Sequence, residues 1–184
     1  LCALIPQLPS RTRVLILQHP QEVGHALNTA RLAALGLLNC ELRCAEYVEE
    51  LPQLLSDSRW HSCLLFPGEQ SVAVGRFATE SAAKPLQLVV PDGTWRKVRK
   101  LLHLNPELAA LPRVTLASVS ASRYRVRKAA MPGALSTIEA IVQALEEVEG
   151  HGLFQPLLRP FEALIEGQIA AMGEATYQRN HPLD

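Results

Sequence analysis

Short apolar runs recur along the chain up to residue 116, and they constrain its fold more than any other feature. The strongest occupy residues 13–18, 61–66 and 86–90, and weaker ones occupy residues 41–45 and 113–116. Their length and their Val, Ile and Leu content are typical of strands buried on both faces of a sheet. Buried strands that alternate with helices predict an α/β fold with a mostly parallel sheet flanked by helices.

The stretches between and after these runs carry apolar residues three and four positions apart, as amphipathic helices do. We expect helices at residues 25–35, 47–55, 96–102, 135–149 and 154–172. Pro160 is expected to bend or restart the last of them. A further strand is predicted at residues 123–128. We expect residues 1–175 to form one domain and residues 176–184 to be a loosely held tail.

The charge balance by itself does not indicate a nucleic-acid partner, because 18 Lys and Arg residues offset 18 Asp and Glu residues. The cations nevertheless cluster in residues 96–100 and 123–128, and such clusters can form a local phosphate-binding face. No apolar run approaches the roughly 20 residues of a membrane span, and no secretory signal is present. We therefore expect a cytoplasmic protein.

The four cysteines, Cys2, Cys40, Cys44 and Cys63, form no CxxC pair, so free thiols are expected. Because the chain begins with Leu, we expect a segment upstream, and Cys2 could be the remnant of a metal site in it. The GxGxxG, GxxxxGK[ST] and GxSxG patterns do not occur in the sequence. Dinucleotide, P-loop and α/β-hydrolase sites are therefore not indicated.

Residues 91–95, with the sequence Pro-Asp-Gly-Thr-Trp, follow the apolar run 86–90 and precede the basic helix. Ligands bind at the carboxyl ends of strands in open α/β sheets, which makes Asp92 a candidate catalytic carboxylate. Gly93 permits a sharp turn or a close approach to a ligand. The alternative is that Asp92 or Thr94 only caps the helix. Trp95 is either a core residue or a stacking platform.

Three other groups are candidates, each with a purely structural alternative. His19 and Glu22 could do acid–base chemistry or bind a hydroxyl, or they could form an ordinary polar turn. The arginines of residues 123–128 would share one strand face, where they could bind phosphate or carboxylate or simply protect an exposed edge. The helix start at residues 135–137 could bind an anion or a nucleotide-like ligand, or Ser136 could cap it.

Six short strings stand out along the chain. They are QHPQE at residues 18–22, NTARL at 28–32, FPG at 66–68, PDGTW at 91–95, YRVRK at 124–128 and LSTIEA at 135–140. In this order they resemble the motifs of the DTW-domain family, and the similarity covers roughly residues 1–172. It is greatest to the bacterial tRNA-uridine aminocarboxypropyltransferase branch.

The resemblance implies a SPOUT-like fold with a C-terminal trefoil knot. It implies that the 3-amino-3-carboxypropyl group of S-adenosylmethionine is transferred to N3 of a uridine in tRNA, with release of 5′-methylthioadenosine. A SPOUT-like RNA methyltransferase and a non-catalytic RNA-binding module are the alternatives. A monomer is favoured. Relatives carry several cysteines before the domain in a zinc-like arrangement, so zinc is expected only in a full-length protein.

On this interpretation we assign three roles to the candidate residues. Asp92 is the general base or orients N3, Thr94 hydrogen-bonds the donor or the uridine, and Trp95 packs under the loop or against the adenine. The donor-binding residues are Leu65, Phe66, Pro67, Gly68, Val90, Pro91, Gly93, Arg127, Lys128, Leu135, Ser136 and Thr137. The RNA-binding residues are His19, Glu22, Arg96, Arg99, Lys100, Arg123 and Arg125.

Overall fold

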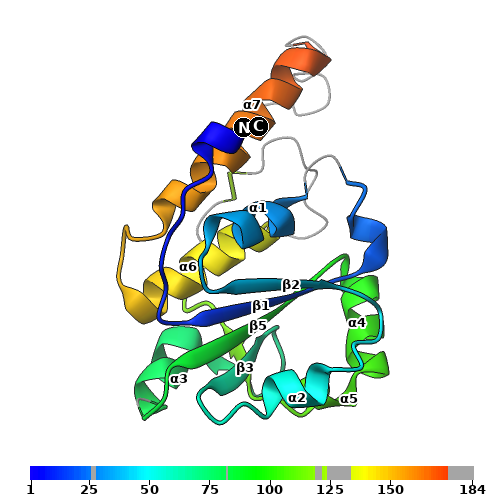
Figure 1. Ribbon diagram of the computed structural model, residues 1–184, viewed down its shortest axis with the longest axis vertical. Helices are drawn as coiled ribbons and strands as arrows, with labels where there is room; N and C mark the ends of the chain where they lie inside the picture. Colours follow the sequence, from blue (N-terminus) through cyan, green and yellow to red (C-terminus); the bar gives the residue numbers. More distant parts are fainter. Residues whose placement is uncertain (26–27, 82, 119–121, 124–133, 174–184) are drawn as a thin grey trace.

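The computed structural model describes residues 1–25, 28–81, 83–118, 122–123 and 134–173. Within them, six parallel strands form one sheet in the order β2-β1-β5-β3-β6-β4 (Figure 1). The strands are β1 (Arg13–Gln18), β2 (Cys40–Cys44), β3 (His61–Leu65), β4 (Val72–Ala73), β5 (Leu86–Asp92) and β6 (Arg113–Thr115). The predicted α/β class with a parallel sheet is confirmed.

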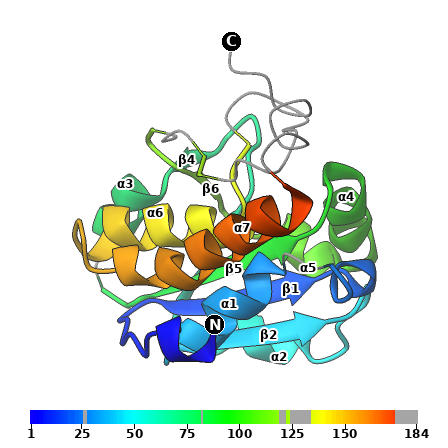
Figure 2. The ribbon, with the colours of Figure 1, turned by 90° about the horizontal axis from the view of Figure 1, so that it is seen from above.

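Helices cover both faces of this sheet. They are α1 (Thr29–Gly36), α2 (Leu51–Leu55), α3 (Val74–Glu80), α4 (Trp95–Leu104), α5 (Pro106–Ala109), α6 (Thr137–Glu149) and α7 (Leu158–Met172). Three 3-10 turns, η1 (Cys2–Leu4), η2 (Pro20–Glu22) and η3 (Gln155–Leu157), complete the described elements. Helices α1 and α6 lie over one face and α2 and α5 over the other, as Figures 1 and 2 show. No described helix is long and apolar enough to cross a membrane.

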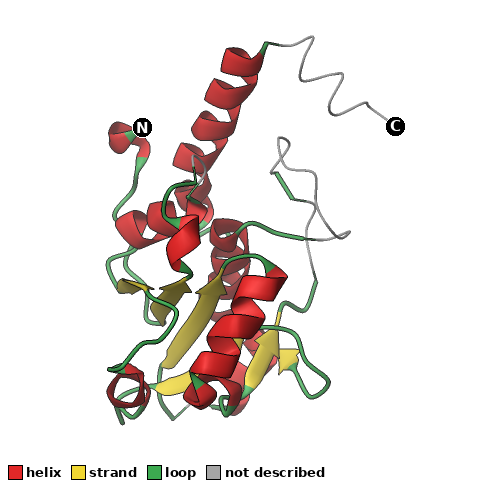
Figure 3. Cartoon of the chain, turned by 90° about the vertical axis from the view of Figure 1, so that its right-hand side faces the viewer, coloured by secondary structure: helices red, strands yellow, loops and turns green. Residues whose placement is uncertain are grey.

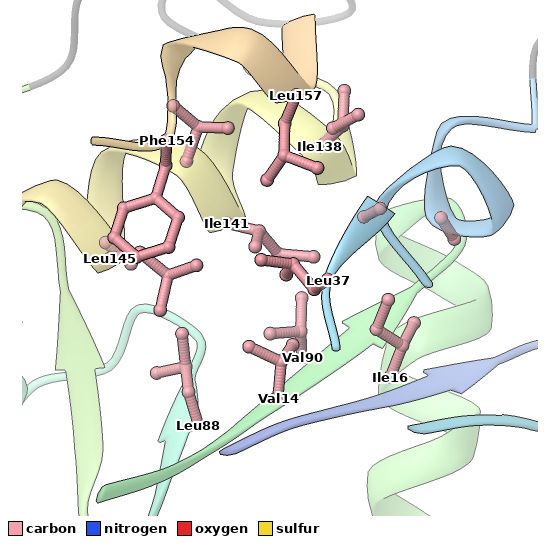
Figure 4. Packing of buried hydrophobic residues seen from close by; sticks show 14 of the residues in the cluster. Val14, Ile16, Leu37, Leu88, Val90, Ile138, Ile141, Leu145, Phe154 and Leu157 are labelled. Atoms are coloured by element: carbon pink, nitrogen blue, oxygen red, sulfur yellow. The ribbon is translucent and has the colours of Figure 1, made fainter. Parts of the chain in front are cut away.

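Alternating side chains of the central strands feed two separate cores. Val14 and Ile16 of β1 face α1, α6 and α7, whereas Leu15 and Leu17 face α2, α4 and α5. Figure 4 shows the first core, in which Ile141 of α6 packs towards the sheet. This period of two explains why the strands read as continuous apolar runs, because both of their faces are buried.

Strand β5 lies between β1 and β3, and its carboxyl end carries Asp92. It pairs with β1 from Gln87 to Asp92, so that Asp92 lies beside Gln18. The backbone N–H of His19 then donates to the carbonyl of Asp92 at 3.0 Å. The strand therefore runs through Asp92, beyond residue 90 where the apolar run ends.

Several elements differ from the predictions. Helix α1 begins at Thr29 because the side chain of Asn28 caps it, accepting from the N–H of Arg31 at 3.0 Å. Helix α7 begins at Leu158, so Pro160 lies in its first turn, where the missing N–H removes no helical hydrogen bond. The end of α7 extends beyond the sheet (Figure 3). Elements β4, α3 and α5 were not predicted. Residues 124–128 of the predicted strand at 123–128 lie outside the described part of the chain.

Candidate functional site

A pocket of about 620 Å³ opens at the carboxyl ends of β3, β5 and β6, between the first turns of α4 and α6. The sequence predicted a site at this edge. The predicted site residues that line the pocket are Glu22, Leu65, Phe66, Pro67, Val90, Pro91, Asp92, Gly93, Thr94, Trp95, Leu135, Ser136 and Thr137. Four segments far apart in the sequence therefore meet at one place.

Asp92 is held at this pocket by hydrogen bonds to both of its carboxylate oxygens. The side-chain amide of Gln18 donates to Oδ2 at 2.8 Å, and the hydroxyl of Thr137 donates to Oδ1. These partners come from β1 and α6, on either side of the strand end. A carboxylate offers about four acceptor positions, so the partners among the described residues leave two for a ligand. Asp92 is thus a fixed acceptor at the pocket wall.

The network extends from Asp92 to the start of α1. The amide of Gln18 also donates to Oδ1 of Asn28 at 2.9 Å, and Asn28 in turn caps α1. Our sequence reasoning named neither Gln18 nor Asn28 as a site residue. The signal was present, because both begin strings of the family resemblance and Gln18 is the polar end of a buried strand.

The cap of α4 comes from Thr94 and not from Asp92. The hydroxyl of Thr94 accepts from the N–H of Lys97 at 3.4 Å, whereas Asp92 is the last residue of β5 and caps no described helix. Gly93 has a φ of +154°, and a Cβ there would lie 3.2 Å from Cβ of Lys97. Glycine at this position lets α4 start directly after the strand.

His19 occupies a different place from the one expected. It is only 2% exposed, its Nδ1 accepts from the N–H of Gln21, and its Nε2 lies 2.8 Å from a carboxylate oxygen of Glu46. Glu46 also pairs with Lys100 at 2.6 Å, and this hydrogen bond lowers the pKa of Glu46. The ring of His19 is therefore buried, with a partner on each of its two nitrogens, and its predicted role in RNA binding stays a prediction.

Glu22 lines the pocket and carries its own counter-charge. Its carboxylate lies 2.7 Å from Nζ of Lys97, and both side chains are largely buried. Nε2 of His25 lies 3.6 Å from the other carboxylate oxygen. The Glu22–Lys97 pair ties η2 to α4 across the loop that follows Asp92.

The helix α6 starts with an N-cap, which is the structural alternative that the sequence offered for residues 135–137. Ser136 caps the helix and forms a reciprocal capping box with Glu139. Glu139 is buried and also accepts from the N–H of Arg123 at 2.6 Å. Capping does not exclude binding, because Ser136 and the next residue, Thr137, both line the pocket.

Some of the cations predicted to bind RNA form ion pairs within the protein, and others do not. Lys100 pairs with Glu46, and Arg123 pairs with Glu162 of α7. Arg96 and Arg99 are exposed and form no ion pair within the residues that the structure describes. Arg125, Arg127 and Lys128 lie outside the described residues.

An aromatic pair marks the mouth of the pocket. The rings of Trp95 and Phe66 lie 5.2 Å apart between centroids, and the guanidinium of Arg113 lies 5.7 Å from the centroid of Phe66. Trp95 is 41% exposed and is not a core residue. Gly68 is not among the residues that line the pocket; a Cβ there would lie 2.8 Å from Cδ of Arg113.

The cysteines bring no metal centre together in the described ranges, where no group of three or more His, Cys, Asp or Glu residues could hold an ion. Cys2 is exposed on η1, and Cys44 is exposed at the end of β2. Burial raises the pKa of the Cys63 thiol to about 12, and burial together with Glu41 does the same for Cys40.

The comparisons with known proteins agree with the resemblance. tRNA-uridine aminocarboxypropyltransferase 2 of Drosophila melanogaster is 31% identical over 91% of this chain and 70% of its own length. The protein of the same name from Macaca fascicularis is 28% identical over 100% of this chain and 64% of its own. tRNA-uridine aminocarboxypropyltransferase A of Arabidopsis thaliana is 29% identical over 83% of this chain and 69% of its own. No solved structure matches the chain.

These relatives are eukaryotic and longer than this chain, which spans between 64% and 70% of their lengths. The bacterial branch stays a prediction. The model of the DTW domain matches residues 1–169, which include the β5–α4 loop, the start of α6 and every described wall of the pocket. The chain belongs to the DTW domain family.

Proposed function

We propose that this chain is a tRNA-uridine aminocarboxypropyltransferase. It would transfer the 3-amino-3-carboxypropyl group of S-adenosylmethionine to N3 of a uridine in tRNA. The observation that carries the proposal is Asp92, held by Gln18 and Thr137 at the wall of a ligand-sized pocket. The names of the relatives, which match most of this chain, support the reaction class.

The pocket suits the donor in size and in the nature of its walls. Its volume of about 620 Å³ lies within the range of small-molecule sites, roughly 300–1,000 Å³. Leu65, Val90 and Leu135 supply apolar walls for an adenosine, and Asp92 and Glu22 supply carboxylates. Glu22 is a candidate partner for the ammonium group of the donor. The pocket also lies at the sheet edge where α/β folds bind ligands.

The reaction needs alignment and removal of one proton. The donor supplies an electrophilic carbon attached to a sulfonium leaving group. A bond forms between N3 and that carbon, while the carbon–sulfur bond breaks and its electron pair leaves with 5′-methylthioadenosine. Asp92 orients N3 through its free acceptor positions and accepts the N3 proton. Because no protein nucleophile is required, holding the two reactants in line provides most of the catalysis.

The proposal includes a SPOUT-like fold with a C-terminal trefoil knot. Its support is the strand order, in which β5 enters between β1 and β3 instead of extending an edge of the sheet. The start of α6 then returns to the ends of these strands, where Thr137 contacts Asp92. Knots are rare in proteins, so the resemblance to the family is the reason for expecting one.

Incubation with in vitro transcribed tRNA and S-adenosylmethionine, followed by mass spectrometry of nucleosides, tests the function. Aminocarboxypropyl-uridine together with 5′-methylthioadenosine is the expected result. Methylated nucleoside with S-adenosylhomocysteine would instead identify a methyltransferase. Retention of tRNA with neither product and without donor binding would favour a non-catalytic binding module. The Asp92→Ala variant is the control for a contaminating activity.

A further inference from the structure

The chemistry of the acceptor restricts the RNA that this site can use. N3 of uridine donates the hydrogen bond on its Watson–Crick edge, so a paired uridine has no accessible N3. A site that modifies N3 must therefore receive an unpaired base turned out of the RNA stack. Enzymes that act on such a base commonly hold it against aromatic side chains. This step rests on the proposed function.

Trp95 is placed to provide that surface. It is the first residue of α4, it lines the pocket, and 41% of it remains exposed, so its ring spans the boundary between the pocket and solvent. The core contacts of α4 come from Val98, Leu101 and Leu102 instead. Phe66 lies beside the ring at 5.2 Å between centroids, inclined by 53°. This contact supports Trp95 and leaves part of the indole uncovered.

The basic residues of α4 differ in whether they are paired with a carboxylate. Lys97 and Lys100 are neutralised by Glu22 and Glu46. Arg99 follows Trp95 by one helical turn and lies on the same face. Arg96 lies three residues before Arg99, so the two arginines are neighbours on the helix surface. Both arginines are exposed and without an ion pair in the described part of the chain. The helix therefore presents its uncompensated cations beside the exposed indole.

We propose that Trp95 is the stacking platform for the unpaired target uridine, and that Arg96 and Arg99 bind the phosphates flanking it. Stacking at the mouth of the pocket aims the Watson–Crick edge of the base at Asp92. Trp95 is then a substrate-binding residue for RNA, and the adenine of the donor lies deeper, among Leu65, Val90 and Leu135. The partner is thus a loop or single-stranded segment of RNA, not a helical stem.

Fluorescence can test this directly, because the chain has only two tryptophans. Trp60 directly precedes β3, at the amino end of the parallel sheet and away from the pocket. In a Trp60→Phe background, oligouridylate or unmodified tRNA should quench the emission of Trp95, whereas 5′-methylthioadenosine alone should not. Quenching by 5′-methylthioadenosine alone would overturn the proposal and assign Trp95 to the donor. No quenching by either RNA would overturn it as well.

Kinetics provide the second test. Trp95→Ala should raise KM for tRNA by about 10- to 100-fold, the effect of losing one stacked base, with donor affinity unchanged. Trp95→Phe should recover most of the loss, and Trp60→Phe should match wild type. Circular dichroism and the melting temperature of Trp95→Ala verify its fold. An unchanged KM for tRNA in an active Trp95→Ala enzyme would refute the stacking role but not the proposed function. A wild-type enzyme without the expected nucleoside product would refute the proposed function, and the quenching result would still decide whether Trp95 binds RNA.

Discussion

Asp92 contributes to the site in two ways that mutagenesis can separate. It offers free acceptor positions to the pocket, and it joins β1 to α6 through Gln18 and Thr137. We expect Asp92→Ala to reduce transfer by about 10²–10⁴-fold, the usual contribution of general acid–base catalysis. The fold should persist with a lower melting temperature, because two donors lose their partner. Single-turnover kinetics and circular dichroism measure the two effects.

Thr137→Val is the matched control for this prediction. It removes the hydrogen bond from α6 to Asp92 but keeps the carboxylate and the shape of the side chain. Its loss of transfer should be at least tenfold smaller than that of Asp92→Ala. Equal losses in the two variants would mean that Asp92 acts by positioning α6 and not through the reacting atoms.

Thiol chemistry gives a second prediction for single residues. Burial raises the pKa of Cys63 to about 12, and Cys44 has a raised pKa because of desolvation and the nearby charge of Asp92. A raised pKa leaves less thiolate at a given pH, and the thiolate is the reactive form. At pH 8 a maleimide should label the exposed Cys2 first and Cys44 more slowly, and it should spare Cys63 in the native protein. Peptide mapping measures the order, and early labelling of Cys63 would contradict the packing of β3.

The sequence was a good guide to residues whose role depends on local order along the chain. Asp92 follows an apolar strand, so its place at the sheet edge could be predicted from residues 86–92 alone. The partners of Asp92 could not, because Gln18 and Thr137 reach it only through the pairing of β1 with β5 and the return of α6. The burial of His19 could not be predicted either, because its partner Glu46 follows a different strand, β2.

At the scale of elements, Gly36 and Gly167 offer a matched pair of substitutions. A Cβ on Gly36 at the end of α1 would lie 2.4 Å from Cδ2 of Leu157, whereas a Cβ on Gly167 in α7 meets no atom within 4 Å. Gly36→Ala should destabilise the protein by about 1–3 kcal/mol through overpacking. Gly167→Ala should stabilise it by about 0.5–1 kcal/mol through helix propensity. Urea unfolding measures both, and equal effects would mean that η3 does not pack closely on α1.

The basic helix α4 yields a prediction about RNA affinity. Lys97 and Lys100 pair with Glu22 and Glu46. The double reversal Arg96→Glu and Arg99→Glu therefore removes the two basic residues of α4 that form no ion pair within the described residues. We expect weaker tRNA binding and a slope of log affinity against log salt that is shallower by about 1.5, since fewer counterions are released. Donor affinity, measured by calorimetry, should stay the same. A slope equal to that of wild type would place the RNA elsewhere.

Elements differed in how far the sequence determined them. The central strands β1, β3 and β5 were predicted because burial on both faces leaves an unbroken apolar run. Strand β4 has two residues and exists only through its pairing with β6, and α5 has four residues, so neither gives a periodic signal. The start of α1 was predicted too early because it depends on a single residue, the cap Asn28.

At the scale of the whole molecule, the topology assembles the site. Inserting β5 between β1 and β3 places Gln18, Asp92 and the end of β3 at one edge, and α6 returns to cover it. The strings of the resemblance lie far apart in sequence, but those within the described residues contribute to this edge or to the elements next to it. A ligand bound here touches β3, β5, β6 and α6 together. Its binding energy is therefore linked to the unfolding of most of the sheet.

This linkage predicts a thermal shift. A ligand that binds only the folded chain stabilises it by about 2.7 kcal/mol at a hundredfold excess over its Kd. For a chain of 184 residues this corresponds to a rise of roughly 5–10 °C in Tm. S-adenosylmethionine and 5′-methylthioadenosine should both raise Tm, and Asp92→Ala should keep most of the shift because the apolar walls of the pocket remain. Scanning fluorimetry measures the shift, and an unchanged Tm at millimolar donor, with tRNA present as well, would contradict donor binding in this pocket.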